Sequence, residues 1–251
     1  MKNIMIPAGS RPVSGVIHSS GSSSDKTLII SHGFRGTKDG GGRATLLAET
    51  IAAAGVSVIR YDFTPLQSLS CQIAELTAVV DYARQTVSSQ IMLLGRSMGG
   101  SASLAVAAAD QKISGLILWA TPWDLITTFR LALGAHYEHL TAGRNLHLTD
   151  QYGNLFLTPD FIRDFQRHDL LAYAKQLTHT SLLMLHGTAD IIVPVCQAHT
   201  IYNMATGPRE LKLYQDGDHH LSDHSTQASA DIVAWLRKAF PSVQLRKDSF
   251  L

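Results

Sequence analysis

The sequence predicts an α/β fold in which a mainly parallel sheet is covered by helices on both faces. Apolar runs of strand length alternate with amphipathic segments of helix length along most of the chain. Several of these runs are apolar without interruption, as strands buried on both faces are. With 251 residues, of which 45% are hydrophobic, the chain can bury one sizeable core. We therefore expect a single domain over residues 1–251 with one insertion.

Seven segments have the length and apolar character of strands. They are residues 13–18, 27–31, 56–61, 90–94, 113–119, 181–185 and 210–214. Right-handed crossovers place the carboxyl ends of parallel strands along one edge of the sheet. Ligands and catalytic groups gather at that edge in open α/β sheets, so the residues that follow each strand are the first candidates for a site.

Segments of helix length fall between most of these strands. They are residues 42–54, 69–88, 98–109, 196–205 and 226–240. The glycine run at 40–42 has no strand immediately before it and no G-x-x-x-x-G-K-[ST] pattern around it. We therefore expect a flexible connection there and not a phosphate-binding loop.

Residues 122–180 interrupt this alternation, because they are far longer than the loops that normally join a strand to a helix. We expect them to form an inserted cap or lid. Helical periodicity extends over 123–140, residues 150–154 have the composition of a turn between two extended pieces, and Thr158 is placed to cap a helix that starts at Pro159. Four aromatic residues of this segment either line a substrate pocket or pack the cap onto the sheet: Trp123, Tyr137, Tyr152 and Phe156.

Charge and composition argue against several classes of partner. The formal net charge is +1 and no block of Lys or Arg occurs, so neither a nucleic acid nor a membrane surface is expected as a partner. The first residues lack the apolar core of a signal peptide, and no uninterrupted apolar stretch is long enough to span a membrane. We expect a soluble, cytoplasmic protein with a small-molecule substrate, and we expect Cys71 and Cys196 to remain thiols.

Twelve histidines raise the question of a metal, especially His219, His220 and His224, and the pair His136 and His139. Zinc sites usually have more specific spacings, such as H-E-x-x-H or paired C-x-x-C, and neither occurs in this sequence. We therefore expect no metal and no cofactor.

Residues 95–100 read Gly-Arg-Ser-Met-Gly-Gly and lie between an apolar run and an Ala-rich run. A strand, a sharp turn with Ser97 at its apex and a helix form the context of the G-x-S-x-G nucleophile elbow. Alone, this pentapeptide fits a purely structural turn equally well. In hydrolases with this elbow, an acid and then a histidine follow the serine along the chain, and both are present here.

The acid and the base each follow a predicted strand. Asp190 comes after residues 181–185, and Asp124 is a lesser rival after 113–119. His219 and His220 lie in a polar turn after 210–214, and their spacing does not decide between them. A serine hydroxyl needs a base that takes its proton, and the base needs an acceptor that fixes its tautomer, so Ser97 with these residues predicts nucleophilic catalysis.

A Gly-rich loop after residues 27–31 is the candidate for the remaining part of such a site, the oxyanion hole. In this architecture that loop donates one backbone N–H to an oxyanion hole, and the residue after the nucleophile donates the second. We assign these roles to Phe34 and Met98. His32, at the start of the loop, is expected to brace it and not to titrate in catalysis.

Together these motifs resemble the α/β-hydrolase superfamily over nearly the whole chain. The segments that carry the resemblance are 32–34, 95–100, 186–194 and 217–219. The cap segment 152–162, followed by Tyr173-Ala174, is similar to the microbial cinnamoyl and feruloyl esterase group of carboxylesterases. The resemblance implies an α/β-hydrolase fold with a small cap after the sixth strand, and it favours His219 as the base because an acidic residue precedes it.

The same resemblance implies hydrolysis of carboxylic esters of small molecules through an acyl-enzyme, with Ser97, His219 and Asp190 as the triad. This sequence departs from the esterase group at one place. The group has a G-x-G-x-S segment after the fourth strand, and residues 61–68, at the corresponding position here, lack it. The aryl-ester preference is therefore open, and short-chain acyl esters are equally compatible. A thioesterase, amidase or peptidase with the same triad is an alternative, as is a catalytically silent fold that binds a small ligand.

Overall fold

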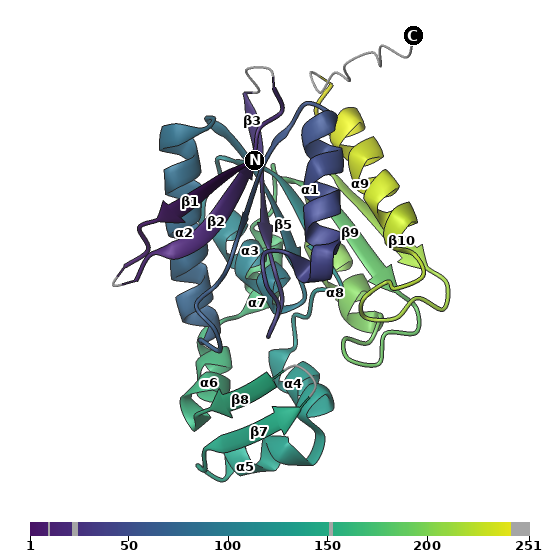
Figure 1. Cartoon of the computed structure of the whole chain (residues 1–251). Helices are drawn as coiled ribbons and strands as arrows, with labels where there is room; N and C mark the ends of the chain where they lie inside the picture. Colours follow the sequence, from purple (N-terminus) through teal and green to yellow (C-terminus); the bar gives the residue numbers. More distant parts are fainter. Residues whose placement is uncertain (10, 22–24, 151–152, 242–251) are drawn as a thin grey trace.

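An eight-stranded sheet lies at the centre of the computed structural model, which describes residues 1–9, 11–21, 25–150 and 153–241 (Figure 1). The spatial order of the strands is β1-β2-β4-β3-β5-β6-β9-β10. Their bounds are β1 Lys2–Ile6, β2 Val13–His18, β3 Lys26–Ser31, β4 Ser57–Tyr61, β5 Gln90–Arg96, β6 Ile113–Trp119, β9 Ser181–Gly187 and β10 Arg209–Tyr214. From β4 to β10 all neighbours pair in parallel, whereas β2 pairs antiparallel with both β1 and β4.

The seven predicted strands are confirmed within one or two residues at each end. The strand β1 was not expected, because its polar start hides the alternation that buries only Ile4 and Ile6. By contrast, β3 and β4 are buried at every residue, although β3 includes Lys26 and β4 includes Arg60.

Helices cover both faces of the sheet (Figure 1). Helices α1 (Arg43–Ala53) and α9 (Ser225–Ala239) lie on one face, and α2 (Leu69–Thr86), α3 (Met98–Ala109) and α8 (Cys196–Met204) lie on the other. The five predicted helices are therefore confirmed. The glycine run at 40–42, which we expected to be a flexible connection, instead forms a short 3-10 turn that leads directly into α1.

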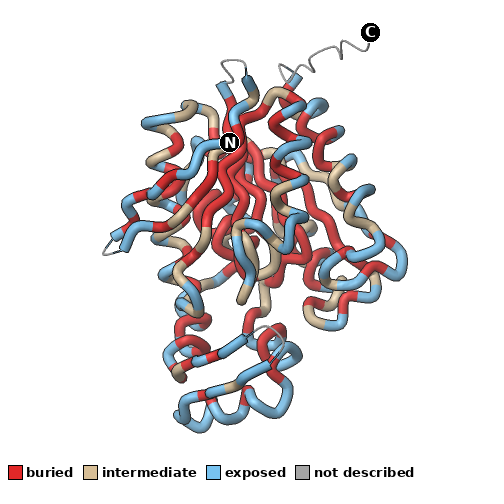
Figure 2. Tube along the Cα trace, in the orientation of Figure 1, coloured by how far each residue is buried: buried red, intermediate tan, exposed pale blue. Residues whose placement is uncertain are grey.

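Two hydrophobic clusters correspond to the two covered faces, and Figure 2 shows the buried strands between them. Alternate residues of one strand belong to different clusters. In β3, Ile29 packs with α2 and α3, whereas Leu28 and Ile30 pack with α1 and α9. The alternation follows from the pleat, because successive side chains of a strand point to opposite faces.

The chain between β6 and β9 forms a separate layer beyond the carboxyl ends of the strands (Figure 1). It comprises α4 (Leu125–Leu133), a 3-10 turn (Gly134–His136), α5 (Tyr137–Thr141), the antiparallel hairpin β7 (Leu146–Asp150) and β8 (Gly153–Leu157), α6 (Pro159–Arg163), a second 3-10 turn (Asp164–Arg167) and α7 (Leu170–Lys175). We refer to residues 122–180 as the inserted segment. Its end, α7, packs back against α3.

Two expectations within the inserted segment are corrected. The helix predicted over 123–140 is broken at Gly134, whose φ of 54° is outside the helical range, so the periodicity extends across two helices and a turn. Thr158 does precede the helix that starts at Pro159, but its hydroxyl makes no capping hydrogen bond. The turn expected at 150–154 does separate two extended pieces, although residues 151 and 152 lie outside the described residues.

Two further observations concern the cysteines and the length of the apolar helices. Cys71 and Cys196 are free thiols on the surface. Within the described ranges, no helix combines the length and the apolar character needed to cross a membrane.

Candidate active site

Ser97 lies between the end of β5 and the start of α3, at the carboxyl edge of the sheet. Its φ is 52°, a left-handed value that is unfavourable for a residue with a side chain. The surrounding hydrogen bonds hold it there: the Ser97 N–H donates to the Trp119 carbonyl at 2.9 Å, and the Ser97 carbonyl accepts from Gly100 N–H at 2.8 Å. Backbone strain held in this way is typical of functional turns and aims the hydroxyl away from the sheet.

Glycines allow the turn to be this tight. A Cβ on Gly95 would collide with the backbone of α3, and a Cβ on Gly99 would collide with the carbonyl of His32. The elbow therefore packs against both its own helix and the loop that follows β3. Any larger residue at either position would push these elements apart.

His219 joins Ser97 to Asp190. Its Nε2 lies 3.2 Å from the Ser97 hydroxyl oxygen, and its Nδ1 lies 2.8 Å from Oδ2 of Asp190. The three side chains come from loops after β5, β9 and β10, which parallel pairing brings to one edge. The arrangement is that of a nucleophile, a base and the group that orients the base.

The Asp190 carboxylate is buried and held from several sides. Its Oδ1 accepts hydrogen bonds from the N–H groups of Ile192 at 2.9 Å and Val193 at 2.8 Å. Burial alone would raise the pKa of Asp190, but contacts with His186 and His219 and the backbone donors outweigh it, so its pKa lies well below the ordinary range. Asp190 is therefore ionised at neutral pH.

This charge state fixes the tautomer of His219. An ionised carboxylate has no proton to donate, so Nδ1 of His219 must donate to Asp190. In the neutral imidazole, Nε2 then carries a lone pair and accepts from the Ser97 hydroxyl. The geometry thus supports removal of the proton from Ser97.

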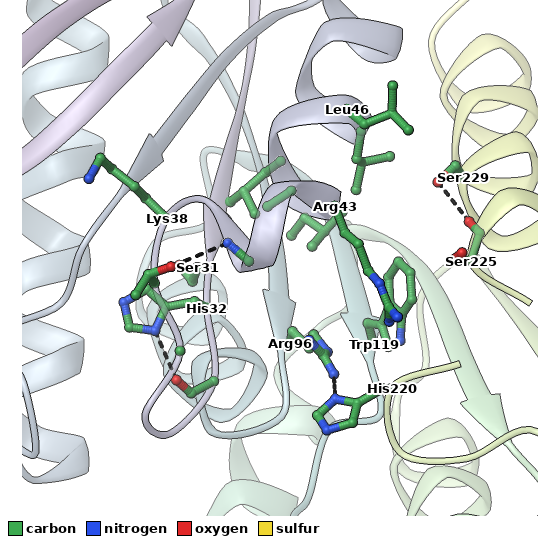
Figure 3. A pocket seen from close by; sticks show the side chains of 18 of the residues that line it. Ser31, His32, Lys38, Arg43, Leu46, Arg96, Trp119, His220, Ser225 and Ser229 are labelled. Atoms are coloured by element: carbon green, nitrogen blue, oxygen red, sulfur yellow. Dashed lines mark hydrogen bonds between the residues drawn. The ribbon is translucent and has the colours of Figure 1, made fainter. Parts of the chain in front are cut away.

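The two rival residues have other partners. His220 does not point to Asp190; its Nδ1 contacts the Arg96 guanidinium (Figure 3). Asp124 caps α4, where it accepts from the backbone and the hydroxyl of Thr127 at 2.9 and 2.6 Å. Of the alternatives left open by the sequence, the structure brings His219 and Asp190 to Ser97.

The proposed oxyanion donors lie on two sides of Ser97. Met98 is the first residue of α3, where a helix leaves its N–H without an internal partner. The loop of Phe34 lies against the elbow, since a Cβ on Gly33 would be 3.0 Å from the Cβ of Ser97. Among the described residues, neither the Phe34 nor the Met98 N–H has an acceptor.

His32 braces this loop as expected. Its Nε2 accepts from the Phe63 N–H at 3.0 Å, so its Nδ1 donates to the Gly33 carbonyl at 2.8 Å. Burial lowers the pKa of His32, which keeps this ring neutral. Both ring nitrogens are therefore occupied in holding the loop.

The inserted segment contacts the site through aromatic rings. Phe34 packs against Phe129 and Phe161, with ring centroids 5.0 and 5.4 Å apart. Of the aromatic residues singled out in the sequence, Tyr137 is buried inside the segment, Trp123 is partly buried against the core, and Phe156 is 45% exposed. Tyr152 lies outside the described residues.

Sequence reasoning missed the role of His186. This buried side chain lies at the end of β9, with Nε2 2.8 Å from the Val193 carbonyl and 3.4 Å from Oδ2 of Asp190. It holds the turn that carries Asp190. The spacing of four residues between His186 and Asp190, across a short turn, was the sequence feature that could have indicated this contact.

The histidines considered for a metal have separate partners. His224 contacts the Gln215 carbonyl through Nε2 at 3.0 Å, and the rings of His136 and His139 lie 6.3 Å apart. Over the ranges that the structure describes, no group of three or more His, Cys, Asp or Glu side chains is placed to hold a metal ion.

Comparison with known families gives a match over most of the chain. The sequence model of the acetyl xylan esterase (AXE1) family matches residues 67–239, which include Ser97, Asp190 and His219. No curated protein sequence matches the chain.

Many solved structures share this fold. Est1E from Butyrivibrio proteoclasticus is 19% identical with a TM-score of 0.81, and the match covers 96% of this chain and 100% of that one. A structure of Est1E with ferulic acid bound gives 19% identity and a TM-score of 0.82 over 95% of this chain and 100% of that one. The Pyrococcus furiosus esterase Pf2001 is 18% identical with a TM-score of 0.73, over 94% of this chain and 89% of that one. The predicted α/β-hydrolase fold is thereby confirmed.

Proposed function

Because the chain belongs to the acetyl xylan esterase (AXE1) family and is a carboxylesterase-type hydrolase, we propose that Ser97, His219 and Asp190 carry out its ester hydrolysis through an acyl-enzyme. The observation that carries this proposal is the continuous chain of hydrogen bonds from the Ser97 hydroxyl through His219 to Asp190.

Acylation begins when Nε2 of His219 takes the Ser97 proton and Oγ attacks the carbonyl carbon of the ester. The carbonyl oxygen becomes an oxyanion, which the N–H groups of Phe34 and Met98 stabilise. The imidazolium that forms keeps its Nδ1–H bond to ionised Asp190. When the intermediate collapses, the alcohol leaves with the proton from Nε2, and the acyl group remains on Ser97.

Deacylation repeats these steps with water. Nε2 of His219 takes a proton from a water molecule, whose oxygen attacks the acyl carbon. The second oxyanion collapses, Ser97 Oγ leaves and takes back the proton, and the carboxylic acid is released. The same two backbone donors act in both halves of the reaction.

For the substrate, we propose small esters with a short acyl or an aryl group. The family name refers to an acetyl ester, and Est1E was solved with ferulic acid, an aryl acid. The rings of Phe34, Phe129 and Phe161 border the loop that carries the first oxyanion donor, which supports an apolar group near the acyl carbon.

The proposal is tested with p-nitrophenyl acetate, butyrate and octanoate and with methyl ferulate, comparing wild type with Ser97→Ala. Turnover should fall by about 10⁴-fold or more in the variant. A matched control is Ser103→Ala, since this serine lies in α3 and its hydroxyl donates to the Gly99 carbonyl at 2.8 Å. We expect the control to keep turnover within a few-fold of wild type.

Other outcomes identify the alternatives. Turnover of a matched thioester, amide or peptide in place of these esters would assign the triad to that bond. If none is turned over, labelling with a fluorophosphonate distinguishes an activated Ser97 from an inert one, and an unlabelled serine would support a silent binding fold.

A further inference from the structure

A cavity of about 390 Å³ lies beside the candidate active site, between α1 and α9 on one face of the sheet (Figure 3). Most of its wall is apolar, and Ile30, Leu47 and Leu94 form part of it. Leu46 of α1 also lines the cavity, and its side chain is 66% exposed. The cavity is thus built for a ligand with an apolar part.

Hydrogen-bond donors without acceptors meet in the same cavity. Trp119 is only 8% exposed, and its indole Nε1–H has no partner among the described residues. The Nε–H of Arg96 is likewise buried and unpaired. Buried donors are nearly always satisfied in native proteins, so two in one cavity indicate a missing acceptor.

Positive charge gathers there and is not neutralised. Arg43, at the start of α1, makes no hydrogen bond or ion pair with a described residue, whereas Lys38 is already paired with Asp62 at 2.7 Å. None of the described residues that line the cavity is acidic. Burial and the charge of Arg43 lower the pKa of Arg96, and the carboxylates of Asp218 and Asp190 offset this only in part.

The start of α9 adds to this potential. Ser225 and Thr226, the first residues of this 15-residue helix, line the cavity, and the residue before them makes no side-chain cap. The unpaired N–H groups and the helix dipole at such an end favour an anion.

The cavity adjoins the proposed reaction centre but does not include its triad. Its wall contains Arg96 and His220, the chain neighbours of Ser97 and His219, and Gly33, which lies against Ser97. None of Ser97, Asp190 and His219 lines it. Arg96 and His220 contact each other at the wall of the cavity (Figure 3).

We propose that this cavity is a second ligand site, which binds a carboxylate with an apolar chain or ring. The carboxylate accepts from the guanidinium groups of Arg43 and Arg96 and from the Trp119 indole, and the apolar part lies along Leu46 and Leu47. A planar monoanion fits the fork of a guanidinium and costs less to bury in an apolar wall than a doubly charged phosphate. The volume is in the range of small-ligand pockets.

The test uses octanoate as the probe, with octan-1-ol and acetate as controls that lack the charge or the chain. We expect calorimetry on the wild-type protein to give a dissociation constant for octanoate at least tenfold below those of both controls. In a ¹⁵N-labelled sample, octanoate should shift the indole N–H signal of Trp119, identified as the one lost in Trp119→Phe. The chain has three tryptophans, so this assignment is direct.

Two pairs of surface variants locate the binding. Arg43→Gln should weaken octanoate binding about tenfold, and Arg144→Gln, at an exposed arginine of the inserted segment, should leave it unchanged. Leu46→Glu places a charged side chain against the apolar chain of octanoate and should abolish binding. Leu131→Glu changes a leucine of α4 that is 47% exposed and should have no effect.

The proposal is overturned if octanoate does not bind, or if the Trp119 signal stays in place. It is equally overturned if Arg43→Gln binds octanoate as tightly as wild type while octanoate competes with p-nitrophenyl acetate, because the fatty acid then occupies the reaction centre. The calorimetric and NMR readouts do not depend on turnover, so a failure of either one leaves the assignment of Ser97 unaffected.

Discussion

Asp190→Asn is the substitution whose effect follows most directly from the hydrogen bonds of the site. The two oxygens of Asp190 have different partners: Oδ1 accepts from the N–H groups of Ile192 and Val193, and Oδ2 accepts from His219. An asparagine must place its carbonyl oxygen on one side and its NH₂ group on the other. The reverse orientation would leave two backbone donors facing an NH₂ group, at about 1–3 kcal/mol each.

The oxygen therefore stays with the backbone, and the NH₂ group faces Nδ1 of His219. Nδ1 then has to accept, which moves the ring proton to Nε2, where it points at Ser97. In this tautomer the imidazole has no lone pair for the serine proton. We expect kcat to fall by about 10⁴-fold, equivalent to about 5 kcal/mol of transition-state stabilisation.

The assay is steady-state hydrolysis of p-nitrophenyl acetate at neutral pH, with circular dichroism to check the fold. The matched control is Asp124→Asn. Asp124 is the other acidic residue that follows a strand, and its side chain caps α4. We expect its kcat to stay within a few-fold of wild type. If Asp190→Asn keeps kcat within tenfold of wild type, or if Asp124→Asn causes the larger loss, the assignment of the acid is wrong.

Three further predictions concern the same region. His219→Ala should lower kcat/KM on p-nitrophenyl acetate by about 10⁴-fold or more, and His220→Ala should leave most of the activity, because only His219 contacts the serine. Folding lowers the pKa of Asp190, so its ionised carboxylate stabilises the folded state at pH values above the ordinary aspartate pKa of about 4. This contribution to the free energy of unfolding is lost as the pH falls below that value. Urea unfolding at several pH values should show the loss in wild type and less of it in Asp190→Asn. Asp150→Asn removes the ion pair with Arg35 at 2.7 Å, and calorimetric scans should show a Tm no more than about 4 °C lower, because a half-exposed pair contributes about 1 kcal/mol at most.

The sheet and the order of the site residues could be predicted because they depend on local patterns. The centres of buried parallel strands such as β3 and β5 are continuous apolar runs, and Ser97 directly follows β5. Gly95 and Gly99 mark the elbow because only glycine fits where helix and strand meet. Local sequence therefore located Ser97 and Asp190, and the choice of His219 over His220 came from the family resemblance.

The remaining features depend on contacts between distant segments. The break at Gly134 was hidden because apolar spacing continues across it. The sequence predicted His186 only as part of a motif. Its contact with Asp190 could not be predicted, because the distance between the two side chains depends on the path of the turn that joins them. The cavity between α1 and α9 combines Arg43, Arg96 and Trp119 from three separate elements, and no local pattern relates them.

The most direct test of the account is to detect the covalent intermediate on Ser97. The protein would be mixed with p-nitrophenyl acetate, quenched in acid within the first turnover, digested and analysed by mass spectrometry. The account predicts an acetyl group on the peptide that contains Ser97, together with a burst of p-nitrophenol that is absent in Ser97→Ala. Ester turnover that persists in Ser97→Ala, or an acetyl group found on another residue, would contradict it.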